Sequence, residues 1–374
     1  MFPADYYRIL SRINSIDPVA YSRTRNHTDG AVTRLSAYLS RGVISTADVM
    51  ESLIQRGFSF DDTSALLKEL AWRDYFQRVW QVRDVHQDLR STASAKIAGI
   101  PAGILNAATG INAVDHAIRE MYRTGYMHNH CRLYTAAIAC NFASFGWQDP
   151  ARWMYYHLLD GDWASNACSW QWTAGTFSSK PYFANQENIN MFTGSEQRST
   201  WLDVPYESLA DVVCPDAARR PEPLELQAEL PVFPLPEIDP ALPVCIYNYY
   251  NLDPNWRTDR PHNRILLLEP EHFRRYPVSS QCVEFMFRLA SNIPGLMFFT
   301  GSWDELDEIL SADYGAPAVY YKEHPLNRHY HGTADDRGWL DPDIEGFFPS
   351  FSAYWKKIEP GLRQAFRINS LIRA

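Results

Sequence analysis

Residues 160 to 172 read Asp160-Gly-Asp-Trp-Ala-Ser-Asn-Ala-Cys-Ser-Trp-Gln-Trp172. The two carboxylates at the start predict a turn that enters a helix, because Asp is a good cap for the first helical turn. On that helix Asn166 lies one turn beyond Asp162, and Trp170 comes one turn later. Two Trp residues this close are normally part of a core. Each feature alone has such an ordinary explanation, but their order and spacing together indicate a specific site.

A second polar and aromatic pattern lies upstream, on a helix expected around residues 66–80. Glu69, Trp72, Arg73 and Phe76 are spaced i, i+3, i+4 and i+7, so they share one helical face. The simplest explanation of this face alone is an amphipathic helix with an ion pair.

A third pattern follows on the next polar helix. Asn129, Arg132 and Leu133 share a face there, and His128 precedes them. A lone Asn and a lone Arg in such positions are usually a helix cap and a surface charge.

Taken together, these patterns resemble the cryptochrome/photolyase family. The resemblance covers roughly residues 21–185 and corresponds to the all-helical FAD-binding domain of that family. The matching motifs are Tyr21-x-Arg-Thr-Arg25, Thr33-Arg34-Leu35-Ser36, Glu69-Leu-Ala-Trp72-Arg73, Thr109-Gly110 with Asp115, Thr124-Gly125-Tyr126-Met127-His128-Asn129-x-x-Arg132, Trp147, and the stretch 160–172.

The resemblance implies an FAD folded into a U. Tyr21, Thr33 and Ser36 offer hydroxyls and loop amides suited to a pyrophosphate. Arg132 and Asp160 resemble the family's ion pair beside the isoalloxazine ring, where a buried charge needs its partner. The cofactor-binding residues implied in this way are Tyr21, Thr33, Leu35, Ser36, Arg73, Phe76, Asn129, Arg132, Asp160, Asp162 and Asn166.

Two of these residues face the reactive ring in the family. Asp162 would bond the pyrimidine edge of the flavin, and Asn166 falls where the family places the residue that faces flavin N5. An amide oxygen can accept a hydrogen bond from N5–H, so it suits a reduced, anionic flavin. Plant cryptochromes carry Asp at this position and insect cryptochromes carry Cys, whereas repair enzymes carry Asn.

The resemblance also implies a pocket for damaged DNA beside the flavin. Glu69 falls where photolyases hold the damaged pyrimidine pair, and Trp72 and Trp172 fall where two indole planes can clasp a flipped-out dinucleotide. Asn129 would bridge flavin and lesion. The (6-4) photolyases have a His pair where this chain has Asn129 and Leu133, so cyclobutane dimers are the expected substrate. The implied catalytic residues are Glu69, Trp72, Asn129, Asn166 and Trp172, and the implied DNA-binding residues are Arg25, Trp72, His130 and Trp172.

Some positions depart from the family pattern. His130 stands where many photolyases have an Arg near the phosphates, and Ala184 stands where a basic residue is common. Trp170 and Trp147 match the inner and middle members of the family's electron-transfer chain, but the outer Trp expected near residues 92–98 is missing.

The organisation of the chain changes near residue 205. Residues 1–204 repeat apolar side chains at helical spacing, which predicts a helical domain. Residues 205–243 contain nine prolines and predict an extended linker over a surface. Residues 244–374 predict a small parallel-sheet, Rossmann-like α/β domain with a C-terminal tail. Its expected strands lie at 244–247, 264–268, 296–299 and 318–321, and its expected helices at 279–292 and 303–310.

This second domain resembles a shortened form of the family's antenna domain, moved to the C-terminus. The helix between its first two strands is replaced by residues 252–263, which argues against an antenna chromophore. His324, His329 and His331 lie in a loop without Cys and do not predict a metal site.

Composition and charge limit the class of protein. The chain has 374 residues, of which 46% are hydrophobic and 21% charged, and this rules out disorder. Aromatic residues make up 14%, which fits a heavily packed core or a flat conjugated ligand between aromatic walls. No run of about 18 apolar residues predicts a membrane span, and the N-terminus does not resemble a signal peptide. Six dispersed Cys residues predict reduced thiols and a cytoplasmic protein.

The net charge of −9 arises entirely after residue 203, because residues 1–203 carry 19 basic and 19 acidic side chains. This balance argues against a protein that coats DNA but leaves room for a local basic groove.

We therefore expect blue-light-driven, FAD-dependent repair of cyclobutane pyrimidine dimers by electron transfer from the excited reduced flavin, with damaged DNA as the partner. The alternative is a cryptochrome-type photoreceptor without repair activity, whose flavin redox change alters a contact with a protein partner. The neutral charge and the lost basic positions favour this alternative. A third hypothesis is a light-independent FAD-binding or structural protein. The sequence predicts no oligomeric state.

Overall fold

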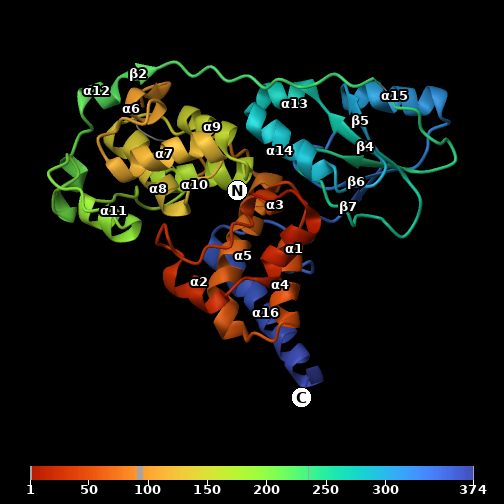
Figure 1. Ribbon diagram of the computed structural model, residues 1–374, viewed down its shortest axis with the longest axis horizontal. Helices are drawn as coiled ribbons and strands as arrows, with labels where there is room; N and C mark the ends of the chain where they lie inside the picture. The colour runs from red at the N-terminus through yellow and green to blue at the C-terminus, as the bar shows by residue number, and fades with distance from the viewer. Residues whose placement is uncertain (1, 91–95, 235, 374) are drawn as a thin grey trace.

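The computed structural model describes residues 2–90, 96–234 and 236–373 (Figure 1). A helical part that contains α1 to α11 is followed by an α/β part with a parallel five-stranded sheet, which confirms the predicted fold class. In Figure 1 the α/β part lies at the upper right and α6 to α11 at the upper left. Helices α1 to α5 lie below them, together with the C-terminal helix α16.

Helix α5, Phe60–Val82, is the longest helix of the helical part and packs against α2, α4, α10 and α16. It begins at a capping box in which Ser59 and Asp62 each accept a hydrogen bond from the other's backbone amide. The other elements of this part are α1 (Tyr6–Asn14), α2 (Pro18–Thr24), α3 (Ser36–Ser40), α4 (Thr46–Gln55), β1 (Ile100–Pro101), α6 (Ala102–Leu105), α7 (Asn112–Thr124), α8 (Asn129–Ala137), the π-helical turn η1 (Ile138–Phe142), α9 (Gln148–His157), α10 (Trp163–Ala174) and α11 (Gln186–Thr193).

The sheet has the strand order β5-β4-β3-β6-β7, with every neighbouring pair parallel. The four apolar runs of the sequence form β3 (Val244–Tyr247), β4 (Asn263–Leu268), β5 (Leu296–Thr300) and β6 (Val319–Lys322). The two expected helices form α14 (Ser280–Ala290) and α15 (Trp303–Asp313), and a further short helix is α13 (Pro270–Arg275). No helix connects β3 to β4, as the sequence predicts. The edge strand β7 (Thr333–Asp335) was not predicted, because it is short and contains no apolar run.

The Pro-rich segment follows the surface past both parts, along the upper edge of Figure 1. It is mostly extended, as predicted, but it also contains the short elements η2 (Tyr206–Asp211), α12 (Asp216–Arg219) and β2 (Pro221–Glu222). Strand β2 pairs antiparallel with β1 and so ties the segment to the helical part. A backbone bond from Thr300 to Phe233 ties it to β5.

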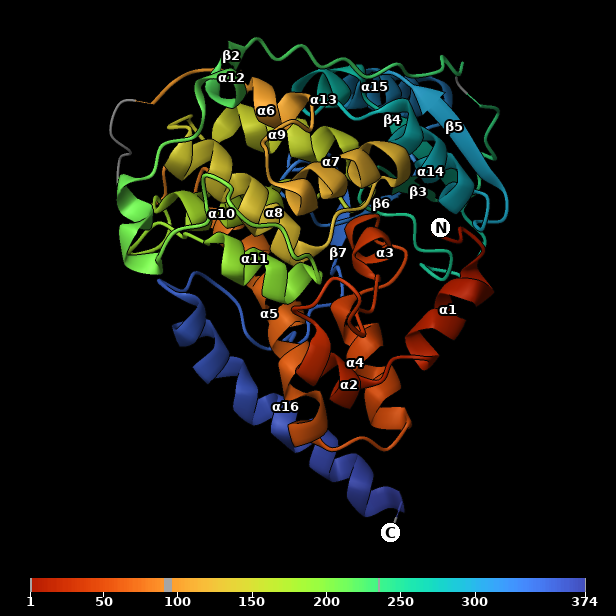
Figure 2. The ribbon, with the colours of Figure 1, turned by 60° about the vertical axis from the view of Figure 1, so that its left-hand side comes forward.

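The expected C-terminal tail contains the helix α16, Phe351–Arg373, which returns to the helical part and lies along α5 (Figure 2). Tyr354 stacks on Tyr75 with ring centroids 5.9 Å apart, and Phe366 contacts the edge of Phe60 at 6.0 Å. The last helix therefore belongs by its packing to the helical part.

The two parts share much of their interior. One cluster of buried apolar side chains runs from α1 and α5 into β3, β4 and α14, and a smaller cluster covers the other face of the sheet. All six Cys residues are buried free thiols. Among the described residues, the search for a helix with the length and apolar character needed to cross a membrane returns none.

Candidate functional site

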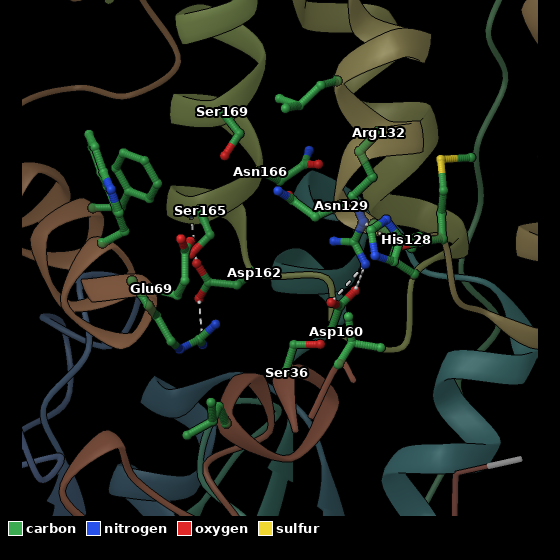
Figure 3. Close-up of a pocket in the computed structure, with 18 of the residues that line it drawn as sticks. Ser36, Glu69, His128, Asn129, Arg132, Asp160, Asp162, Ser165, Asn166 and Ser169 are labelled. Carbon is green, nitrogen blue, oxygen red and sulfur yellow. Dashed lines mark hydrogen bonds and ion pairs between the residues drawn. The ribbon is translucent and has the colours of Figure 1, made fainter. Parts of the chain in front are cut away.

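A cavity of about 470 Å³ opens in the helical part, between α2, α3, α5, α8 and α10. This volume lies in the range of small-molecule and cofactor sites. In Figure 3 polar side chains from all sides point into it: Glu69 and Asp162 from the left, Ser165, Asn166 and Ser169 from above, Asn129 and Arg132 from the right, and Asp160 and Ser36 from below.

The end of α3 holds the loop that leads into α10. Ser40 Oγ donates to the carbonyl of Asp160 at 2.8 Å, and the fully buried guanidinium of Arg41 donates to the carbonyl of Gly161. A side chain at Gly161 would place its Cβ 2.9 Å from the carbonyl oxygen of Tyr155, so only glycine fits this loop. Sequence reasoning missed Ser40 and Arg41, because their contacts bridge 120 residues.

Arg132 and Asp160 form an ion pair at the cavity wall. Arg132 Nη2 lies 3.0 and 2.9 Å from the two carboxylate oxygens of Asp160, and Nε donates to the carbonyl of Met127 at 2.9 Å. Only 6% of the Asp160 side chain is exposed. The pair thus places one fixed charge of each sign beside the cavity.

Asp162 caps α10 and is bonded on several sides. Its Oδ1 accepts from the amide of Ser165 at 2.8 Å, and its Oδ2 accepts from Gln77 Nε2 at 2.6 Å. Arg73 Nη2 lies 3.4 Å from the same Oδ2. The carboxylate is 2% exposed, so these donors replace water around it.

A hydrogen-bond chain continues from Asp162 into the α/β part. The side-chain oxygen of Gln77 accepts from Arg337 Nη1 at 2.6 Å, and Arg337 Nη2 pairs with Glu323 at 2.7 Å. Gln77 and Arg337 are 260 residues apart, and no local pattern in the sequence marks either of them.

Two polar groups on the first turns of α10 lack a partner. Asn166 Nδ2 donates to the carbonyl of Ala151 at 2.8 Å, which turns its oxygen toward the cavity (Figure 3). The buried hydroxyl of Ser165 has no hydrogen-bond partner among the described residues. Both residues line the cavity and could bond a ligand there.

Glu69 and Arg73 do not form the ion pair that their spacing allows. Glu69 pairs instead with Arg25, with Oε1 and Nε 3.6 Å apart, while Arg73 turns toward Asp162 and Ser40. The Glu69 side chain is 44% exposed, but it faces the cavity. Partial loss of water there raises its pKa, against the opposing effect of Arg25.

Two indoles flank this carboxylate on the cavity wall. Trp72 is half-buried and stacks flat on Phe351, with ring centroids 3.7 Å apart and an angle of 9° between the planes. Trp172 is 38% exposed and contacts Tyr182 at 5.8 Å. The stack on Phe351 covers one face of Trp72 and leaves its remaining surface toward the cavity.

Most of the residues singled out in the sequence line this one cavity. They are Tyr21, Arg25, Thr33, Ser36, Glu69, Trp72, Arg73, Phe76, Asn129, Arg132, Asp160, Asp162, Asn166, Trp170 and Trp172. Arg34, Tyr126 and Ser165 also line it and were not predicted.

Three predicted site residues lie outside the lining. Leu35 is 1% exposed and packs in the core, so its side chain offers nothing to a ligand. Trp147 is buried and donates to Asp88 at 2.8 Å. His130 packs against Phe192, and burial lowers its pKa to about 4. A neutral imidazole supplies no positive charge for a phosphate, so the structure does not support the expected role of His130.

The segment in which the outer Trp is missing is only partly visible. Residues 91–95 lie outside the described residues, and Lys96, Ile97 and Ala98 follow them.

Comparison with known proteins identifies this part of the chain. Residues 66–201 match the family model described as the FAD binding domain of DNA photolyase. The chain carries a cryptochrome/photolyase FAD-binding domain. The match contains the face of Glu69 and Trp72 and the stretch 160–172.

Relatives cover only part of each protein. The deoxyribodipyrimidine photo-lyase of Streptomyces griseus is 33% identical over 155 residues, which is 39% of this chain and 32% of the relative. The mitochondrial enzyme of that name from Saccharomyces cerevisiae is 29% identical over 46% of this chain and 34% of its own length. The match thus spans about a third of either relative. A Synechocystis cryptochrome structure aligns at 23% identity with a TM-score of 0.41, over 50% of this chain and 43% of its own.

The cofactor of this domain is FAD, and the cavity fits it. Arg132 with Asp160 offers charges, Asp162 offers a carboxylate, and the unpaired groups of Asn166 and Ser165 offer an acceptor and a hydroxyl. Such a set suits a large ligand with both polar edges and a flat ring.

Proposed function

We propose that this protein is a light-driven, FAD-dependent enzyme that splits cyclobutane pyrimidine dimers in DNA. One observation carries the proposal: Glu69, Trp72 and Trp172 line the same cavity as Arg132, Asp160 and Asn166. A flavin held by the second set would therefore lie beside a lesion held by the first.

Residues of α3, α8 and α10 would hold the cofactor. Asp162 would accept from the pyrimidine edge of the ring, and Asn166 would present its free oxygen to N5–H. Arg132 and Asp160 would flank the ring as a neutral pair, since each compensates the charge of the other. When bound in its reduced form and excited by light, FAD supplies one electron to the dimer and takes it back after the ring has split.

The lesion would be held by Glu69 and the two indoles. Trp72 and Trp172 offer planar surfaces, on which a base stacks with about 1–3 kcal/mol of stabilisation. Glu69 Oε2 would accept from a thymine N–H, and the ion pair with Arg25 keeps the carboxylate in its charged, accepting form. Because Asn129 and Leu133 stand where a His pair would be needed for (6-4) lesions, the proposed substrate is the cyclobutane dimer.

The test is illumination of the FAD-loaded, reduced protein with dimer-containing oligonucleotides, followed through recovery of absorbance near the thymine band. Glu69→Ala should slow repair about tenfold or more, because a hydrogen bond to a charged group contributes about 1.5–3 kcal/mol. Its FAD content should not change. The matched control is Glu308→Ala on α15, an exposed glutamate far from the cavity, which should repair at the wild-type rate. Wild-type protein that binds FAD but restores no thymine refutes the proposal.

A photoreceptor without repair activity is the second candidate, and the state of His130 favours it. The position that is basic in many photolyases is neutral here and lies outside the cavity. Under this candidate, light changes the flavin redox state or the oligomeric state while dimer-containing and plain DNA bind equally weakly. The same illumination experiment, with a parallel DNA-binding measurement, separates the two functions.

A further inference from the structure

The positions that the resemblance assigns to DNA phosphates provide little free positive charge. Arg25 is paired with Glu69 at 3.6 Å, and burial keeps His130 neutral at physiological pH. If DNA delivers a lesion to the cavity, other basic residues near the cavity wall must contact its backbone, because phosphate neutralisation dominates the affinity of proteins for DNA.

Helix α16 is basic, although the chain after residue 203 is acidic overall. It carries Lys356, Lys357, Arg363, Arg367 and Arg373, with Glu359 as its single acidic residue. Arg363 is engaged by Glu359 and Asp61. Lys356 and Lys357 are exposed and have no ion-pair partner in the part of the chain that the structure describes. Two positive charges are thus available near the start of this helix.

The start of α16 lies against the proposed lesion pocket. Phe351, its first residue, stacks on Trp72, which lines the cavity. One turn later Trp355 contacts the ammonium group of Lys68, the neighbour of Glu69 on α5, at 5.4 Å. Lys356 and Lys357 follow Phe351 by five and six residues, which is about 8–9 Å along the helix axis. That distance spans two to three phosphates of one DNA strand, at about 3.4 Å of axis each.

The packing of α16 fixes the position of these charges. Tyr354 is fully buried against Tyr75, and Ile358 and Leu362 are also buried on the same face. The lysines lie off this buried face, so they can bind an anion without moving the helix.

We propose that Lys356 and Lys357 of α16 bind backbone phosphates of the lesion-bearing DNA strand beside the pocket. The proposal rests on the proposed function and adds a second DNA-binding element, which lies outside the matched FAD-binding domain.

The experiment measures binding of FAD-loaded protein to fluorescent duplexes with and without one dimer, in the dark, across a series of salt concentrations. For Lys356→Gln/Lys357→Gln we expect the slope of log K against log salt to become shallower by about 1.8, since each lost phosphate contact removes about 0.9. Affinity at 50 mM salt should fall at least about fivefold for both duplexes. The preference for the dimer should not change, because phosphate contacts carry no lesion information. FAD per chain and the repair rate at saturating DNA should also be unchanged.

The matched control is Arg260→Gln/Arg288→Gln, which removes two exposed positive charges from the α/β part. An equal loss of affinity in this control means that only net charge matters and overturns the inference, as does an unchanged salt slope in the α16 variant. Wild-type protein without any preference for the dimer instead refutes the proposed function, so the two failures are distinguishable.

Discussion

The hydrogen-bond chain from Asp162 through Gln77 to Arg337 should couple the flavin site to the α/β part. Gln77 is 4% exposed and bonds two charged groups, each at 2.6 Å. Replacing it with Leu keeps the volume but removes both bonds. A hydrogen bond to a charged group contributes about 1.5–3 kcal/mol. Asp162 keeps Arg73 and the Ser165 amide, and Arg337 keeps Glu323, so we take the lower value twice and expect Gln77→Leu to cost about 3 kcal/mol of unfolding free energy.

Arg337→Met removes one of the same two bonds. The double variant should therefore be more stable than the sum of the single effects predicts, by about 1.5 kcal/mol. Urea unfolding of the four FAD-loaded proteins, followed by circular dichroism, measures this coupling. Gln364→Leu on the exposed face of α16 is the control for the substitution itself and should change stability by less than about 0.5 kcal/mol. Effects of Gln77→Leu and Arg337→Met that add within about 0.5 kcal/mol would refute a continuous chain.

Three further predictions follow from individual side chains. Burial raises the pKa of Asp74 to about 6, above its unfolded value of about 3.9, so the folded state holds its proton longer and stability falls as pH rises between those values; the unfolding free energy of wild type relative to Asp74→Asn should drop by up to about 3 kcal/mol from pH 4 to pH 7 in thermal or urea titrations, and a flat difference contradicts this. Asp160→Ala leaves Arg132 without its counter-charge and should lose most of the FAD, measured as flavin absorbance per chain, whereas full occupancy would remove the pair from the site. Trp170→Phe should strongly slow light-driven flavin reduction while dark chemical reduction proceeds normally, and unchanged photoreduction would leave Trp170 as a core residue only.

The parts of the fold that depend on local pattern could be predicted from the sequence. Continuous apolar runs such as 264–268 form buried parallel strands because both faces of the sheet are covered. Strand β7 has no such run, since it pairs on one side only and lies at the sheet edge. Helix α16 was missed although Tyr354, Ile358, Leu362 and Phe366 recur every four residues. Pro360 interrupts the pattern, but it lies on the exposed face, where water can bond the carbonyl that loses its partner.

The candidate site divides in the same way. The stretch 160–172 contains its own cap and spacing, so Asp162 and Asn166 could be placed on one helix before the structure was known. The partners of these residues come from distant segments. Neither the bond from Gln77 to Arg337 nor the stack of Trp72 on Phe351 leaves a signal in local sequence. Spacing also suggested Arg73 for Glu69, but the buried Asp162 attracts that guanidinium and leaves Glu69 to Arg25.

The most direct test of the account is a single-turnover flash experiment on reduced, FAD-loaded protein saturated with a dimer-containing oligonucleotide. We expect thymine absorbance to recover after each flash, in the reduced protein only and never in the dark. Glu69→Ala should restore about a tenth as many thymines per flash, or fewer. Flashes that excite bound FAD in dimer-saturated protein without restoring any thymine would contradict the claim that one cavity serves both flavin and lesion.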